Sequence, residues 1–434
     1  MMTKPLHYGW VIVVTGTMVL FSCLGLGRFA LGMLLPSMGI SLELSYSQMG
    51  LIGTGNFAGY MASVILAGMV SRVIGARRTI AFGLVLVGGS ILGMSRAGGF
   101  VPLMMLYVLT GVGSGLANVP LMGLVSHWFK KDTRGRAAGT MLSGNGLAIV
   151  FAGLMVPWIN SSLGPDGWRT GWLVIGVISL GVAVISGILL RNDPADMGLD
   201  PVGRPDPARG AVPAAASATD TDNALAAGNP AGAASAAPVD PLPAKKAPHR
   251  WTMVHLGLIY ACFGATYVVY ATFIVTALVD ERGFGEGTAG TFWAAVGALS
   301  IFSGPLFGWL SDRLGRKITI IGVYLLFTLS YVLAGADLSL PFLYVSIGIF
   351  GLAVWSIPTI MSAAVGDYMG PALAVRAFGF ITLFFGAGQI AGPALAGVLA
   401  DTFGSFSPAF FLCAVLTAAG AGLTLFLKPP ANPD

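Results

Sequence analysis

Long apolar stretches separated by short polar segments dominate the chain. An α-helix crosses the hydrocarbon core of a membrane with about 20 apolar residues at 1.5 Å each. These stretches are too uniformly apolar for soluble amphipathic helices, and too long and non-alternating for outer-membrane strands. The pattern predicts twelve transmembrane helices, over 9–36, 47–71, 77–95, 101–128, 137–160, 170–190, 253–279, 289–311, 318–336, 341–365, 377–400 and 408–427.

Composition points to the same class of protein. Of 434 residues, 55% are hydrophobic and only 9% are charged, whereas a soluble domain carries about 25% charged residues. The formal net charge of +5 rests on too few charges to form a nucleic-acid-binding patch. Small residues let membrane helices approach closely, so the 62 glycines are interpreted as packing surfaces. We expect an all-α membrane protein in the lipid bilayer, with no nucleic-acid partner.

The positions of lysine and arginine predict an orientation. If the N-terminus is cytoplasmic, short cytoplasmic segments hold 13 of the 23 basic residues and the outer loops hold 3. Cytoplasmic loops normally carry the excess of positive charge. Both termini are therefore predicted to be cytoplasmic, in a multi-pass protein of the plasma membrane (the inner membrane of a bacterium).

The middle of the chain differs from the rest. Residues 206–240 are dominated by Ala, Pro, Gly, Asp, Ser and Thr and contain no aromatic residue, a composition that cannot bury a core. We interpret 191–250 as a flexible cytoplasmic linker, with a partner-binding segment as the alternative. It separates an N-terminal six-helix half, 1–190, from a C-terminal six-helix half, 251–434.

The two halves repeat a short loop of glycines and basic residues after their second predicted helix. The glycines permit tight turns, and an acid that pairs with a base on a neighbouring helix makes a contact that can form and break between two states. The candidate gating residues are Gly68, Arg72, Arg77 and Arg78 in the first copy, and Gly308, Asp312, Arg313, Gly315, Arg316 and Lys317 in the second.

With twelve spans and a central linker, this loop resembles the signature of the major facilitator superfamily, G-x-L-x-D-R-x-G-R-R/K. The second copy fits at nearly every position, whereas the first has Arg72 where the family has its acid. Segments such as Tyr8-Gly9-Trp10 and Gly167-Trp168-Arg169 are similar to the monocarboxylate transporter and oxalate/formate antiporter families. The resemblance implies two six-helix pseudo-repeat halves that transport a solute by alternating access.

Arg28 is the one basic residue deep in a predicted helix. It lies 18 residues after Trp10 and 8 before Pro36, or about 27 Å and about 12 Å along an ideal helix. An arginine at depth costs at least ~2.5 kcal/mol and is normally directed at a cavity or a partner. No acid lies deep in a predicted helix, so an anionic substrate, held by two parallel hydrogen bonds, is the favoured counter-ion. The alternative is a structural arginine that bonds helix-end carbonyls or a neighbouring span.

The superfamily's architecture implies further candidates, because its spans 1, 4, 7 and 10 line the central path. Asn and Tyr offer hydrogen bonds to a carboxylate or hydroxyl, and Trp offers an apolar wall. Near mid-depth on spans 4, 7 and 10 lie Asn118, Tyr267, Tyr270 and Trp355.

Three more polar residues in spans are weaker candidates. Asn145 and Gln389 on spans 5 and 11 are costly in lipid unless paired, so we interpret them first as interhelical contacts and second as substrate contacts. His255 on span 7 is a candidate for proton handling, with an interfacial hydrogen bond as the simpler interpretation. Span 8 lacks the Asp and Arg that serve the monocarboxylate family as a coupling pair.

The leading hypothesis is a secondary transporter of a small organic anion, first of all a monocarboxylate. A multidrug or amphipathic-compound exporter is the alternative, which the 18 methionines permit, and a transporter-like sensor is the third. No nucleotide-binding motif and no metal-ligand or catalytic constellation occurs in the spans. We therefore expect no enzyme, cofactor or metal, and a monomer that moves its anion with or without a co-transported proton or other ion.

Overall fold

The computed structural model describes residues 7–203 and 247–427. Twelve helical segments in this part of the chain are long and apolar enough to cross a membrane, which confirms the predicted all-α class and number of spans. The first span is composite: α1 (Gly9–Leu20) continues into a π-helical segment, η1 (Phe21–Phe29), and then into α2 (Ala30–Leu42).

The remaining spans follow in chain order. The first half continues with α3 (Tyr46–Ile74), α4 (Ala76–Met94), α5 (Phe100–Trp128), α6 (Lys131–Leu163), a 3-10 turn η2 (Gly164–Asp166), α7 (Gly167–Leu189) and a 3-10 turn η3 (Pro194–Met197). The second half contains α8 (Ala247–Thr276) with the π-helical turn η6 (Ala277–Glu281), α9 (Glu286–Leu314), α10 (Arg316–Gly335), α11 (Leu340–Ala353), α12 (Ser356–Met369), α13 (Pro371–Phe403) and α14 (Ser407–Leu425). Helices α11 and α12 together form the tenth span.

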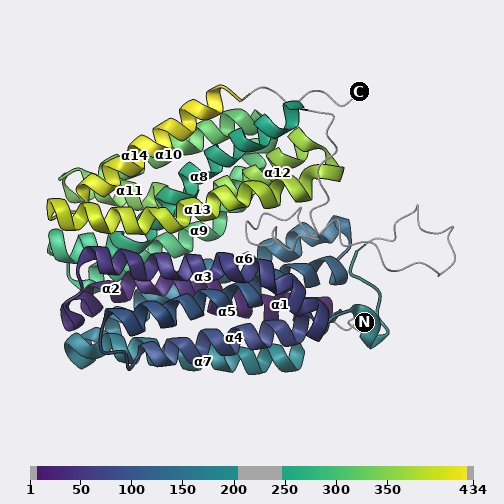
Figure 1. Ribbon diagram of the computed structural model, residues 1–434, viewed down its shortest axis with the longest axis horizontal. Helices are drawn as coiled ribbons and strands as arrows, with labels where there is room; N and C mark the ends of the chain where they lie inside the picture. Colours follow the sequence, from purple (N-terminus) through teal and green to yellow (C-terminus); the bar gives the residue numbers. More distant parts are fainter. Residues whose placement is uncertain (1–6, 204–246, 428–434) are drawn as a thin grey trace, which may run out of the picture.

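The spans assemble into two groups of six, α1 to α7 and α8 to α14, as predicted for two pseudo-repeat halves. The groups lie against each other at one end of the molecule and diverge toward the other (Figure 1). We call the diverging end, where α7 ends and α8 begins, the linker face, and the other end the opposite face. Because each span crosses once, the turns at Gly75 and Gly315 lie at the linker face.

Residues 191–203, which the sequence placed in a flexible linker, pack against the end of α5. The Trp128 indole Nε1 donates to Arg191 O at 3.0 Å. The Val202 amide donates to Trp128 O at 2.9 Å, and the Lys130 amide donates to Val202 O at 2.8 Å. Residues 204–246 of the predicted linker lie outside the described residues.

Glycines let helices of the same half touch through their backbones. A Cβ atom added at Gly83 on α4 would lie 2.6 Å from Gly113 O and 2.7 Å from Ala117 N on α5. Real Cβ atoms do not approach backbone this closely, so this contact requires glycine. The same kind of contact joins the two halves: a Cβ at Gly153 on α6 would lie 2.6 Å from Gly290 O on α9. Glycines such as these therefore serve as packing surfaces, whereas others, such as Gly89, have no atom within 4 Å of an added Cβ.

Two glycines of α4 provide a matched test of this packing. We expect Gly83→Val to lower the midpoint of thermal unfolding clearly, because overpacking against fixed backbone costs about 1–3 kcal/mol. Gly89→Val, on the same helix with no atom within 4 Å of its added Cβ, should change the midpoint little. Thermal unfolding of both variants in the same detergent checks this; equal midpoints would contradict the assignment.

Candidate functional site

A cavity of about 460 Å³ lies between the two halves, a volume typical of small-molecule sites. Its walls come from η1, α3 and α6 on one side and from α8, α9, the start of α10, α12 and α13 on the other. The lining runs from Arg28 and Tyr267, in the middle of their spans, to Gly135, Asp312 and Arg316 at the linker face. The cavity thus reaches one face of the molecule.

At the opposite face the two halves are joined. Both carboxylate oxygens of Asp401 on α13 accept hydrogen bonds at the start of α3, from the Tyr46 amide at 2.8 Å and the Ser47 amide at 2.9 Å. Asn160 Nδ2 on α6 donates to Glu286 Oε2 on α9 at 2.7 Å. The cavity lining includes no residue of this face, so the cavity does not reach it.

Arg28 sits at the deep end of the cavity, on η1. Its Nε donates to Asn56 Oδ1 on α3 at 3.3 Å. Its guanidinium carbon lies 4.5 Å from the Phe57 ring centroid and 4.7 Å from that of Tyr60, at cation–π distance. Nη2 is buried without a hydrogen-bond partner, and no ion pair forms at Arg28 among the described residues. The structure therefore shows the bond to a neighbouring span that was the structural alternative, and it also leaves the charge without a counter-ion.

Behind Arg28 lies a void of about 10 Å³, lined among others by Phe57, Tyr107 and Thr272. This is about the room that one water molecule needs. Arg28 thus stands between the open cavity and the packed region toward the opposite face.

Four more of the predicted substrate residues line the same cavity: Tyr267, Trp355, Asn145 and Gln389. Gln389 Nε2 donates to the Tyr267 hydroxyl. The Trp355 ring stands edge-on to Phe29, with centroids 5.7 Å apart. Asn145 is 4% exposed, and its Oδ1 has no hydrogen-bond partner in the described part of the chain.

Three predicted residues do not line the cavity. Asn118 Nδ2 donates to the Tyr60 hydroxyl at 2.9 Å, so it supports a wall residue from behind. The Tyr270 hydroxyl pairs with Ser346 Oγ at 3.0 Å, and its ring stacks on Phe350, within the second half. His255 Nε2 lies 2.8 Å from Leu423 O, a hydrogen bond between α8 and α14.

The aromatic and amide partners of Arg28 were missed from the sequence. Asn56, Phe57 and Tyr60 lie on the second span, whereas the family resemblance directed attention to spans 1, 4, 7 and 10. One signal was available: Asn56 is an amide in an apolar span, and Tyr60 follows it at i+4, on the same helix face.

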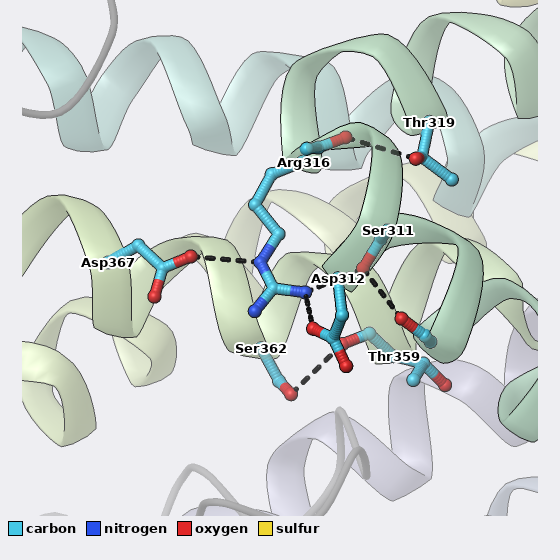
Figure 2. A network of polar contacts seen from close by, with 9 residues as sticks. Ser311, Asp312, Arg316, Thr319, Thr359, Ser362 and Asp367 are labelled. Carbon is cyan, nitrogen blue, oxygen red and sulfur yellow. Dashed lines mark hydrogen bonds and ion pairs between the residues drawn. The ribbon is translucent and has the colours of Figure 1, made fainter.

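The second-copy loop forms a compact polar cluster at the cavity mouth (Figure 2). Arg316 Nε donates to Asp367 Oδ2 at 2.8 Å, and its Nη1 donates to Asp312 Oδ1 at 2.5 Å and to Ser311 Oγ at 2.6 Å. Arg316 thereby ties the end of α9 and the start of α10 to the end of α12, all within the second half. Beside it, the Arg313 guanidinium lies over the Trp309 ring at 4.3 Å, and Lys317 is half-buried.

The first-copy loop repeats the turn but not the ion pairs. Gly75 and Gly315 have φ of +84° and +88°, a conformation that favours glycine. Arg72 is exposed and makes no ion pair among the described residues, whereas Arg77 Nε donates to Gly187 O at 2.6 Å. Of the other predicted members of this copy, Gly68 is half-buried and Arg78 is exposed.

Two six-helix halves around a cavity that reaches one face are the architecture typical of a secondary membrane transporter. A model of the Major Facilitator Superfamily matches residues 17–304 and 256–434, and the chain belongs to this superfamily. It is accordingly a multi-pass integral membrane protein that handles small molecules.

Three curated relatives match nearly the whole chain. They are the hexuronate transporter of Bacillus subtilis, 24% identical over 93% of this chain and 91% of that protein, the probable sulfoacetate transporter SauU of Cupriavidus necator, 23% identical over 91% and 88%, and monocarboxylate transporter 11 of Mus musculus, 25% identical over 98% and 89%. A crystal structure of a bacterial homologue of the human lysosomal transporter Spinster, inward-facing and occupied, covers 100% of both chains with a TM-score of 0.76 at 15% identity. This last match supports the fold.

Removing the Asp401 carboxylate should loosen the opposite face. We expect Asp401→Ala to speed thiol labelling of Thr272→Cys, which lines the void behind Arg28, in a chain whose native cysteines are replaced by alanine. A hydrogen bond contributes about 1 kcal/mol, or about fivefold in population. Asp166→Ala is the control, because Asp166 pairs with Ser41 and Arg169 inside the first half. Equal labelling rates in both variants would show that Asp401 does not hold the halves together.

Proposed function

We propose that this chain is a secondary transporter of a small organic anion, first of all a monocarboxylate, which binds Arg28 between the two halves. The main support for this proposal is that Arg28 lines the deep end of the cavity and forms no ion pair among the described residues. A guanidinium can grip a carboxylate with two parallel hydrogen bonds. Aromatic rings stabilise the empty charge in part, and the anion would complete its neutralisation.

The remainder of such an anion would meet a mixed wall. Tyr267, Gln389 and Asn145 provide polar groups, and Phe29 and Trp355 provide apolar surface. An amide can donate or accept a hydrogen bond, so the unpaired Oδ1 of Asn145 favours a substrate with a polar group besides its carboxylate. Asn118 would act indirectly, through Tyr60.

The relatives support an acidic substrate. Hexuronate, sulfoacetate and monocarboxylates all carry acid groups, and the proteins named for them align with this chain over nearly their whole length. Identities of 23–25% are too low to transfer any one of these substrates. What these three relatives share is the anionic class, which agrees with the lone arginine. A shorter match, to multidrug resistance protein 1 of Bacillus subtilis over 42% of this chain, does not share it.

The cavity and the charge distribution together suggest the transport state. With the linker face in the cytoplasm, as the 13-to-3 distribution of basic residues favours, the cavity would be open inward in a bacterial inner membrane. Transport would follow when the halves rock around Arg28, breaking the Asp401 and Glu286 contacts at the opposite face. The Asp312–Arg316–Asp367 cluster would keep the mouth of the second half rigid during this movement.

A second candidate function is the export of amphipathic compounds. It is favoured by the aromatic and sulfur-containing part of the wall, Phe29, Met61, Trp355 and Phe385. Such a site would bind neutral or cationic amphiphiles through apolar contact, and it would give Arg28 no role in recognition.

A ligand screen distinguishes the two functions. We expect L-lactate, D-glucuronate or sulfoacetate to raise the melting temperature of the purified protein, because a ligand at 100 times its Kd stabilises the folded state by about 2.7 kcal/mol. Arg28→Gln should abolish this shift. Arg72→Gln, which changes an exposed arginine, should keep it.

The same ligand screen can also favour the exporter. If carboxylates leave the melting temperature unchanged while amines or neutral amphiphiles raise it in the wild type and in Arg28→Gln alike, the anion proposal fails and the exporter takes its place.

A further inference from the structure

The segment that carries Arg28 is not an ordinary helix. Phe21–Phe29 forms nine residues of π-helix between two α-helices. π-Helical turns are rare and usually short, and they often occur at functional sites. A change from i−4 to i−5 bonding disturbs the backbone pairing, and buried carbonyls need partners.

Side chains from two neighbouring helices supply those partners. Ser114 Oγ on α5 donates to Cys23 O at 2.6 Å, with Thr110 O of its own helix as a second acceptor at 2.8 Å. The Tyr107 hydroxyl on α5 donates to Arg28 O at 2.9 Å. Asn56 Nδ2 on α3 lies 3.5 Å from Gly27 O. Ser114 and Tyr107 therefore hold the backbone of η1 at two points, Ser114 near its beginning and Tyr107 at Arg28.

The three donors are deeply buried and do not line the cavity. Asn56 is 0% exposed, and Ser114 and Tyr107 are 1% exposed; none of the three lines the cavity. They therefore cannot contact a solute in the cavity directly. Their visible action is on the backbone of η1 and, for Asn56, on the Arg28 Nε as well.

We propose that Tyr107 and Ser114 are positioning residues: they hold η1 in its wide-turn form and thereby direct the Arg28 side chain into the cavity. The form of the η1 backbone and the direction of the Arg28 side chain do not depend on which solute is transported. The consequence for anion binding rests on the proposed function.

The expected effect of losing these bonds follows from helix geometry. An α-helix turns by about 100° per residue, so closing the wide turns into α-helix would rotate the side chains at the end of η1 around its axis by an angle of that order. The Arg28 side chain would then leave the cavity and point toward the neighbouring helices. Position 28 should become less accessible while other walls of the cavity stay accessible.

The chain offers a matched control for a buried tyrosine. The Tyr324 hydroxyl also donates to a backbone carbonyl, Ile259 O on α8, and Tyr324 is 0% exposed. Its acceptor belongs to a regular α-helix in the other half. Tyr324→Phe thus removes the same chemical bond without touching η1.

The first experiment measures the direction of position 28 and uses no substrate. Arg28→Cys is placed in a chain whose Cys23, Cys262 and Cys413 are alanine; both backbone acceptors remain. The probe is a positively charged methanethiosulfonate reagent on purified protein. We expect Tyr107→Phe with Ser114→Ala to slow labelling at position 28 on the order of tenfold, the effect of losing two hydrogen bonds. Tyr324→Phe should leave the rate unchanged.

Labelling at a second position distinguishes rotation of η1 from a general closing of the cavity. Leu142→Cys lines the same cavity from α6 and should be labelled equally fast with and without the Tyr107→Phe and Ser114→Ala changes. An unchanged rate at position 28 would overturn the inference, and so would an equal fall at positions 28 and 142.

The second experiment connects the geometry to transport. Tyr107→Phe should raise the KM for uptake of D-glucuronate, sulfoacetate or L-lactate into proteoliposomes several-fold, with little change in kcat. Its melting temperature should match that of Tyr324→Phe. If none of the three anions is transported, the proposed function fails, while the labelling rates still decide whether η1 is held by its two hydroxyl donors.

Discussion

The buried charge of Arg28 is the constraint on which the rest of the structure depends. A guanidinium in the middle of a membrane span is expensive to bury, and here no acid from the described residues neutralises it. Instead, Asn56 binds one nitrogen and the Phe57 and Tyr60 rings lie against the charge. This arrangement fixes the side chain of the arginine but leaves its charge without a counter-ion, which is the basis of the proposed anion site.

The two ends of the molecule complement this site. At the opposite face, backbone contact through glycine and the hydrogen bonds of Asp401 press the halves together. At the linker face the same halves leave a cavity that reaches Arg28. The contacts at the closed end are short polar bonds and direct backbone packing, which can separate as rigid surfaces. That property suits a transporter whose halves move as bodies around a central site.

Most of the fold could be predicted from the sequence, because the length of an apolar stretch is set directly by membrane thickness. The site was predictable only in part. Arg28 stood out as a charge in an apolar helix, but Phe57 and Tyr60 did not, because aromatic residues in a membrane span fit packing equally well. The amide of Asn56 was the one signal on that span. Tyr270 shows the converse: it lies at the predicted depth, yet its hydroxyl bonds Ser346. Which side of a helix faces a cavity depends on neighbouring helices, and the π-helical η1 changes that side locally.

The most direct test of the central claim compares a carboxylic acid with its own methyl ester, which keeps the shape and loses the charge. Isothermal titration of the purified protein with D-glucuronate and L-lactate, each beside its methyl ester, measures this. The account predicts that at least one acid binds and that its ester binds at least about tenfold more weakly, since a charge-assisted hydrogen bond contributes about 1.5–3 kcal/mol. An ester that binds as tightly as its acid, or binding by none of the acids, would contradict it.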